Sequence, residues 1–179
     1  MKTTKAITDP LKAAKMTIAL KRVHLRFALL WEMGCHTGLR ISDLLTLKTS
    51  HFSGTDSVAI TEKKTGNVRN LTISPEIMLD IMFFKKIYGL KPDDYLFFSR
   101  HQKKHKPMSR QWAHRVIART ASYIGLQNVS SHSMRKIYAC DKFVSTGSIN
   151  DVKRELGHKH LSTTLIYLKD LLQESYAGV

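Results

Sequence analysis

The chain has 179 residues, enough for one domain with a sizeable core, and its 42% of hydrophobic residues is typical of a globular protein rather than a disordered one. It carries 29 Lys and Arg against 14 Asp and Glu, a formal net charge of +15, which indicates a polyanionic partner such as nucleic acid. No apolar run reaches the roughly 18 residues of a membrane span, and no apolar stretch follows the N-terminal lysines as in a secretory signal, so we expect a cytoplasmic protein.

Helical patterns dominate the sequence. Asp9 and Pro10 are typical of an N-cap and a first helical position, and Ser74, Pro75 and Ser109 mark two further helix starts. In chain order, helices are predicted over residues 10–20, 22–36, 41–47, 75–88, 110–124, 132–145, 149–156 and 161–172.

Two β-like runs interrupt the helices. Residues 58–61 and 69–73 flank turn chemistry at 64–67, which predicts a hairpin. The apolar run 95–98 is a candidate third strand, and the basic residues 100–107 are expected to form an exposed loop. The predicted fold class is therefore α+β, mostly helical with a small antiparallel three-stranded sheet, in one domain.

The two cysteines, Cys35 and Cys140, fall inside apolar helical patterns. They are predicted to be small buried hydrophobes rather than a disulfide. No His and Cys cluster has zinc-ligand spacing, so neither a metal nor a cofactor is expected.

Three motifs, in this order, resemble those of the tyrosine recombinases, also called the phage-integrase family. Residues 38–45, Gly-Leu-Arg-Ile-Ser-Asp-Leu-Leu, resemble the first arginine box of that family, and residues 132–135, His-Ser-Met-Arg, resemble its His-x-x-Arg box. Leu156-Gly157-His158, followed nine residues later by Tyr167, is similar to its last box. The resemblance covers residues 22–170 and implies the fold of a tyrosine-recombinase catalytic domain.

Two arginines of these motifs suit the chemistry of a phosphate. Phosphodiester transfer adds negative charge to the non-bridging oxygens in the transition state, and a guanidinium presents a rigid fork of donors to that charge. Arg40 and Arg135 are the candidates. His132 and Arg135 are spaced i, i+3, so they lie on one helix face and can reach one phosphate.

The resemblance implies roles for the other motif residues. Tyr167 is the nucleophile that forms a covalent link to a DNA 3′-phosphate, and neighbouring cations assist because a free phenol is a poor nucleophile at neutral pH. His132 assists proton transfer, and His158 donates a hydrogen bond to a non-bridging oxygen. Lys64, in the hairpin turn, protonates the leaving 5′-hydroxyl, with Lys63 as the alternative.

Two motif positions depart from the family pattern. Asp43 stands where Glu is frequent, and we expect it to have a local structural role in the first turn of a helix. Ser133 stands where Asp is common. The other tyrosines lack the Gly-His context and are assigned to packing or to the tail: Tyr88, Tyr95, Tyr123, Tyr138 and Tyr176.

Further basic residues are candidates for DNA contacts. The helix that opens after Ser109 presents Arg110, His114 and Arg115, and by resemblance the corresponding helix of the family contacts the major groove. The alternative is a solvated helix face with Trp112 turned toward the core. Three more side chains are candidate phosphate contacts: Lys63, Arg69 and Lys159.

The resemblance also bears on domains and partners. Most family members carry a helical core-binding domain before the catalytic one; we expect it to be absent here, with residues 1–179 forming a single catalytic domain. The chain is then either a naturally short recombinase or an excised catalytic domain. The predicted partners are double-stranded DNA with a specific recombination site, further copies of the chain in a tetramer on DNA, and accessory DNA-bending proteins. The expected location is the cytoplasm, in association with the nucleoid.

The leading function is a site-specific DNA recombinase, and two alternatives stay open. One is a type IB-like DNA topoisomerase, and the other is a catalytically silent DNA-binding relative. The residues after Tyr167 are an equally open point. With Leu171, Leu172 and Tyr176 as the anchor, they either dock on a neighbouring protomer or fold back on their own domain.

Overall fold

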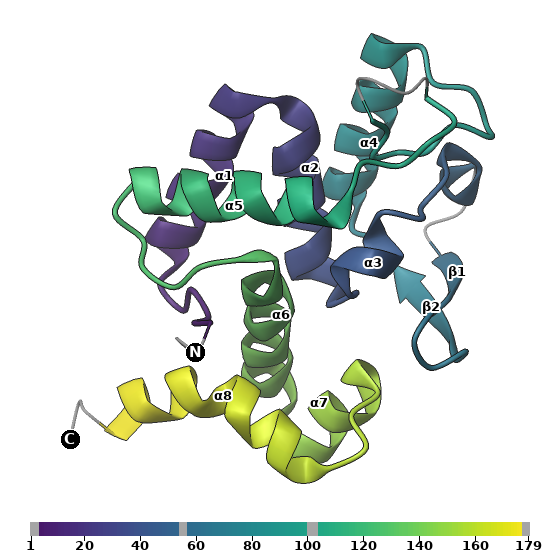
Figure 1. Cartoon of the computed structure of the whole chain (residues 1–179). Coiled ribbons are helices and arrows are strands. Elements are labelled where there is room, and N and C mark those ends of the chain that lie inside the picture. The colour runs from purple at the N-terminus through teal and green to yellow at the C-terminus, as the bar shows by residue number, and fades with distance from the viewer. Residues whose placement is uncertain (1–3, 54–56, 100–103, 177–179) are drawn as a thin grey trace.

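The computed structural model describes residues 4–53, 57–99 and 104–176 (Figure 1). Its elements, in chain order, are α1 (Pro10–Val23), α2 (Leu25–Thr37), α3 (Ile41–Leu44), the 3-10 helix η1 (Thr49–Phe52), β1 (Ser57–Thr61), β2 (Val68–Thr72), α4 (Pro75–Tyr88), α5 (Arg110–Tyr123), α6 (Ser131–Thr146), α7 (Ile149–Leu156) and α8 (Leu161–Tyr176). The mostly helical α+β fold predicted from the sequence is confirmed. Among the described residues, none of the helices combines the length and the apolar character that a bilayer crossing requires.

Short polar side chains start the helices. Asp9 accepts a hydrogen bond from the Leu11 N–H at 2.9 Å, directly before Pro10 at the start of α1. Ser109 does the same for the Trp112 N–H at 3.2 Å at the start of α5. Each cap satisfies a backbone donor that has no partner inside its helix, which is why these starts could be predicted from the sequence.

Strands β1 and β2 form an antiparallel pair in which Ser57 lies opposite Thr72 and Thr61 opposite Val68. Alternate residues point inward, so Val58 and Leu71 are buried. The prediction of a third strand at 95–98 was wrong: in the described part of the chain the sheet has two strands.

The apolar character of the run 95–98 reflects its burial in the core rather than pairing as a strand. Leu96 and Phe97 have no exposed surface. The Tyr95 N–H donates to the Lys104 carbonyl, whereas the Leu96 N–H donates to the Leu47 carbonyl. Successive backbone N–H groups therefore bond to different segments, and the run takes part in isolated β-bridges rather than in a ladder. Of the predicted exposed loop 100–107, residues 100–103 lie outside the described part.

Helix α3 is shorter than predicted, since it ends at Leu44 rather than at residue 47. The Thr46 hydroxyl donates to the Asp43 carbonyl at 2.7 Å, and Leu47 offers its carbonyl to Leu96. The chain therefore leaves the helix after one turn and joins the buried 95–98 segment.

Helix α6 joins two hydrophobic clusters, as Figure 1 shows by its position between the upper helices and the α7–α8 pair. The larger cluster includes Trp31 of α2 and Met134 of α6. The smaller one includes Cys140 of α6, Leu156 of α7 and Leu168 of α8. Helix α6 therefore passes from the larger cluster, which contains Ile137, to the smaller one, which contains Ala139, and connects the two parts of the fold.

Helices α2 and α6 approach each other closely at Gly34. A Cβ atom there would lie 2.4 Å from the Met134 sulfur, so a side chain at this position would force Met134 to move. The two cysteines form no disulfide; Cys140 is buried and Cys35 half-buried.

The C-terminal helix α8 packs against α6 and α7 of the same chain. Leu171 and Leu172 pack against the smaller cluster, whereas the side chain of Tyr176 lies outside the described residues.

Candidate active site

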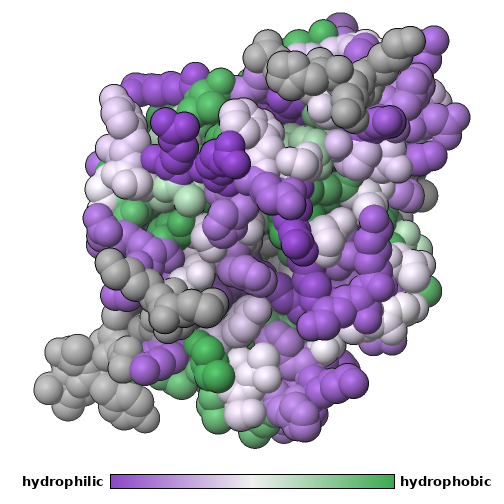
Figure 2. Space-filling view, in the orientation of Figure 1, coloured by the Kyte–Doolittle hydropathy of each residue, from purple (hydrophilic) through white to green (hydrophobic). Residues whose placement is uncertain are grey.

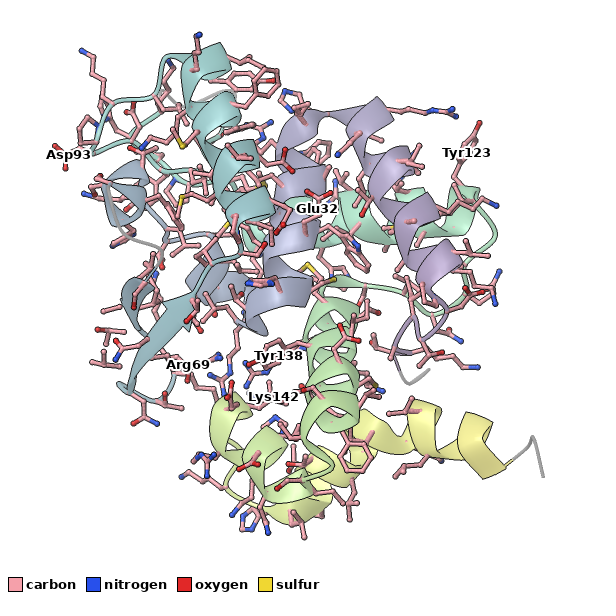
Figure 3. All side chains as sticks on the ribbon, turned by 180° about the vertical axis from the view of Figure 1, so that it is seen from behind. Glu32, Arg69, Asp93, Tyr123, Tyr138 and Lys142 are labelled. Atoms are coloured by element: carbon pink, nitrogen blue, oxygen red, sulfur yellow. The ribbon has the colours of Figure 1, made fainter. Side chains whose placement is uncertain are left out.

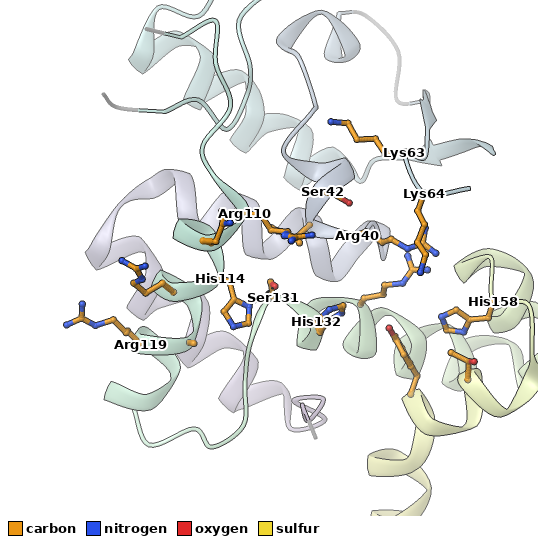
Figure 4. Close-up of a pocket in the computed structure, with 17 residues that line it drawn as sticks. Arg40, Ser42, Lys63, Lys64, Arg110, His114, Arg119, Ser131, His132 and His158 are labelled. Carbon is orange, nitrogen blue, oxygen red and sulfur yellow. Dashed lines mark hydrogen bonds between the residues drawn. The ribbon is translucent and has the colours of Figure 1, made fainter. Parts of the chain in front are cut away.

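One groove collects side chains from five parts of the chain. It has a volume of about 1160 Å³ and is lined by residues of α3, the β1–β2 turn, α5, α6 and the α7–α8 end (Figure 4). Hydrophilic side chains gather across the middle of the face shown in Figure 2. The groove brings together all of the side chains for which the sequence suggested catalytic roles: Arg40, Lys64, His132, Arg135, His158 and Tyr167.

Arg40 follows the end of α2. Gly38 takes the left-handed conformation that ends this helix, with φ at 61°, and the buried Leu39 anchors the next residue. Arg40 then caps α3 with its side chain half-buried, and one guanidinium nitrogen donates to Oε2 of Glu62 at 2.8 Å.

Arg135 lies in α6 with 3% of its side chain exposed. Its guanidinium donates to the carbonyls of Gly38 and Leu156, the ends of α2 and α7. Burial and the charge of Arg40 lower the pKa of Arg135 to about 10, against the opposite influence of Tyr167 and Glu62. The guanidinium therefore keeps its charge at neutral pH, and its backbone bonds tie three helices to the groove.

Glu62 is a central residue that the sequence reasoning missed. It directly precedes the lysines of the hairpin turn, and its side chain is 1% exposed. Burial favours a higher pKa, but hydrogen bonds from Thr65 and Arg40 and the charges of Arg40 and Arg135 outweigh it, so the pKa of Glu62 is lowered. A lone acid within a basic, polar turn was the available signal.

His158 and Tyr167 meet across the junction of α7 and α8. Their rings lie edge to face, with centroids 4.8 Å apart. Nδ1 of His158 lies 3.0 Å from the hydroxyl of Thr164, a buried residue that sequence reasoning also missed. Burial and then the charges of Arg135 and Arg40 lower the pKa of His158 to about 4. The imidazole is therefore neutral at pH 7, with one N–H donor and one acceptor nitrogen.

His132 lies in the first turn of α6 and lines the groove. Burial, His114 and Arg135 all lower its pKa, so it is neutral at pH 7 and able to accept a proton. The hydroxyl of Ser133 accepts the Ser130 N–H at 3.0 Å, which completes a capping box. Serine at the position where the family often has Asp therefore serves the start of α6.

The turn between β1 and β2 carries Lys63 and Lys64 into the groove, both with exposed side chains. The Lys63 N–H donates to Oδ1 of Asp43 at 3.1 Å, and Asp43 is fully buried. Asp43 thus ties α3 to the turn, a structural role. Both lysines stay candidates for the proton donor.

One face of α5 forms the opposite wall. Arg110, His114 and Arg115 line the groove, and so does Arg119, which the sequence reasoning did not include. Nδ1 of His114 lies 3.2 Å from the Ser131 hydroxyl, which links α5 to α6.

Trp112, on another face of α5, is 46% exposed and contacts the edge of Phe27. The ring is therefore neither fully in solvent nor buried in the core.

Two of the suggested phosphate contacts lie outside the groove. Arg69 donates to the Thr37 carbonyl at 3.0 Å and lies 3.8 Å from Oε1 of Glu62. Figure 3 shows it beside Tyr138 in the view from behind. Lys159 is exposed in the loop before α8 and does not line the groove. Within the described ranges, no group of three or more His, Cys, Asp or Glu side chains is arranged to hold a metal ion.

Two curated proteins illustrate the relatives of this sequence. The probable integrase/recombinase YoeC of Bacillus subtilis (strain 168) is 31% identical over 139 residues, which cover 78% of this chain and 75% of that protein. A tyrosine recombinase of Agathobacter rectalis is 30% identical over 159 residues, which cover 87% of this chain and 51% of that protein. The chain thus spans three quarters of one relative and about half of the other.

Solved structures share the fold. The XerA recombinase superposes with a TM-score of 0.78 at 20% identity, over 99% of this chain and 66% of that one. A lambda integrase tetramer bound to a Holliday junction superposes with a TM-score of 0.70 at 18% identity, over 92% of this chain and 49% of that one. The sequence pattern of the phage integrase family matches residues 2–174, and the chain therefore belongs to the phage integrase family, the family of the tyrosine recombinases.

Proposed function

We propose that the chain is a site-specific DNA recombinase that cleaves and rejoins DNA strands through a covalent 3′-phosphotyrosine. The observation that carries the proposal is the convergence of Arg40, Arg135, His158 and Tyr167 on one groove. Two guanidiniums and a neutral imidazole donor are suited to a phosphate whose non-bridging oxygens gain charge during attack.

In the proposed reaction, each of these groups has one role. The Tyr167 oxygen forms a bond to phosphorus, and the bond between phosphorus and the 5′-oxygen breaks. His132, with its lowered pKa, accepts the phenolic proton. Lys64 gives a proton to the leaving 5′-oxygen, with Lys63 as the alternative from the same turn. Attack by a different 5′-hydroxyl reverses these steps and rejoins the strand.

DNA and further copies of the chain are the proposed partners. The basic face of α5 supplies phosphate contacts along the wall of the groove. A lambda integrase with the same fold assembles as a tetramer on a Holliday junction, and we propose a tetramer on a specific recombination site here, with accessory DNA-bending proteins as further partners. We further propose that residues 1–179 form a single catalytic domain.

A trapping experiment tests the proposal. The protein is incubated with nicked duplexes of randomised sequence, whose short cleaved fragment diffuses away and prevents rejoining. We expect a covalent protein–DNA complex that survives denaturing electrophoresis and that enriches one sequence. Tyr167→Phe removes the nucleophile and abolishes the complex. Tyr123→Phe is the matched control, because Tyr123 is 91% exposed and lies outside the groove.

The other outcomes separate the alternatives. A complex that persists in Tyr167→Phe overturns the assignment of the nucleophile. Trapping without sequence enrichment, together with relaxation of a supercoiled plasmid, identifies a type IB-like topoisomerase. Binding without a covalent complex on any duplex identifies a catalytically silent relative.

A further inference from the structure

Glu62 holds the base of the hairpin turn from which the groove lysines extend. Its N–H donates to the Asn67 carbonyl at 2.9 Å, and its carbonyl accepts the Gly66 N–H at 2.8 Å. Oε2 of its side chain accepts from both Arg40 and Thr65, each at 2.8 Å. The carboxylate is thus fixed by the backbone of the turn and by a hydroxyl within it.

Three guanidiniums surround this one carboxylate. Arg40 forms the direct hydrogen bond, while Arg69 and Arg135 lie 3.8 and 4.0 Å from Oε1. Oε1 is buried and accepts no hydrogen bond from any described residue. Its attraction to Arg69 and Arg135 is therefore mainly that of opposite charges, which is strong where water is excluded.

The three arginines depend on Glu62 to different degrees. Arg135 is held by two backbone carbonyls, and Arg69 by the Thr37 carbonyl. For Arg40, the described residues provide its guanidinium with one hydrogen-bond acceptor, Glu62. Among the described residues, the hydrogen bond that orients Arg40 in the groove therefore comes from Glu62.

We propose that Glu62 is the positioning residue for Arg40 and the shared counter-ion of Arg40, Arg69 and Arg135. The proposal rests on the recombinase function argued above, since it assigns Arg40 to the scissile phosphate. Glu62 contributes one negative charge against three positive ones. Its hydrogen bond orients Arg40 for the transition state. Its negative charge at the same time weakens the attraction of the groove for any DNA phosphate.

This double role predicts that binding and cleavage respond in opposite directions. Glu62→Gln removes the charge, so the groove attracts DNA more strongly while Arg40 loses its fixed partner. Glu62→Asp keeps the charge but shortens the side chain, so affinity stays near wild type while cleavage slows. A residue with only a structural role would lower both quantities or neither.

Affinity is measured in the Tyr167→Phe background by fluorescence anisotropy with a short labelled duplex of random sequence. We expect Glu62→Gln to tighten binding about threefold or more. The matched control is Glu32→Gln, which removes the same charge from a half-buried carboxylate paired with Lys21, away from the groove. The control changes affinity less than Glu62→Gln, and equal changes in the two variants would overturn the counter-ion role.

Cleavage is measured as the single-turnover rate of covalent complex formation on the nicked duplex enriched by trapping. We expect Glu62→Gln and Glu62→Asp to lower this rate about tenfold or more. Thermal unfolding verifies that each variant folds. If Glu62→Gln does not fold, Thr65→Val serves in its place, because it removes one hydrogen bond to Glu62 and leaves the carboxylate present. Wild-type rates in both Glu62→Asp and Thr65→Val would overturn the positioning role.

The two measurements also separate this proposal from the proposed function. Absence of a covalent complex with the wild-type protein would contradict the recombinase function. The anisotropy comparison needs no cleavage, so an unchanged or weaker affinity of Glu62→Gln would then still refute the counter-ion role.

Discussion

The imidazole of His158 lies edge-on to the phenol ring of Tyr167, with the two ring planes at 68°. The same imidazole contacts the hydroxyl of Thr164 at 3.0 Å. Thr164 and Tyr167 are three residues apart in α8 and therefore share one face of the helix. The docking of α8 on the smaller hydrophobic cluster thus sets the positions of the two rings relative to each other.

Thr164→Val tests this arrangement. The substitution keeps the buried shape and removes the hydroxyl, so we expect a loss of about 1 kcal/mol in the free energy of unfolding. Cleavage should slow about tenfold, because the His158 ring loses its fixed orientation. Urea unfolding and single-turnover trapping measure the two effects. Thr146→Val is the control, since it removes an exposed hydroxyl bond to the Lys142 carbonyl; equal rates in both variants would contradict the prediction.

The lowered pKa of His158 predicts a pH dependence of stability. In the folded protein the pKa is about 4, below the ordinary value of 6.5, so the unfolded chain binds the proton more readily between these values. The stabilising contribution of the neutral imidazole is thus fully present above pH 6.5 and is lost as the pH falls toward 4.

His158→Gln isolates this contribution, because glutamine does not titrate in this range. Urea unfolding of both proteins between pH 7 and pH 4.5 should show the wild type losing stability relative to the variant as the pH falls. A constant difference across the range would refute the predicted coupling.

Gly38→Ala should lower the free energy of unfolding more than Gly147→Ala does. Gly38 has φ at 61°, and an added Cβ would lie 2.3 Å from the Tyr138 ring. Gly147 has φ at 66° with open space around it, so Gly147→Ala reports the backbone strain alone. We expect about 1 kcal/mol for Gly147→Ala and about 2 kcal/mol more for Gly38→Ala in urea unfolding.

The same substitution should also impair cleavage, because the Gly38 carbonyl accepts from Arg135 and Arg40 lies two residues further on. Gly147→Ala should leave cleavage unchanged. Equal losses of stability in the two variants would show that the α2 end tolerates a side chain.

The basic face of α5 predicts the salt dependence of DNA binding. Arg115→Ala and Arg119→Ala should each reduce the slope of log affinity against log salt concentration by about one unit. Arg154→Ala is the control, since Arg154 pairs with Asp151 on α7 and lies outside the groove. Anisotropy titrations at several salt concentrations provide the slopes, and an unaltered slope for both groove variants would exclude α5 from the DNA interface.

Much of the local structure could be predicted from the sequence because its causes are local. Helix starts are indicated by Asp9, which precedes Pro10, and by Ser109, which precedes α5, because these side chains accept hydrogen bonds from backbone N–H groups of the first helical turn. The apolar spacing within each helix then indicates which face is buried. The order of the arginine, histidine and tyrosine motifs likewise indicated the family, to which the chain belongs.

The tertiary structure decided what depends on distant segments. The run 95–98 has the apolar character of a strand, but its backbone donors meet partners in two other segments, so it forms no ladder. Arg69 resembles a surface cation in sequence, yet the Thr37 carbonyl and Glu62 hold it behind the groove. The role of Glu62 was missed although it is the lone acid of a basic turn, because a buried carboxylate acquires its role from the charges that packing brings around it. The sequence by itself therefore determined the helices and the residue types available for catalysis. Long-range packing alone decided which charged side chains share a site.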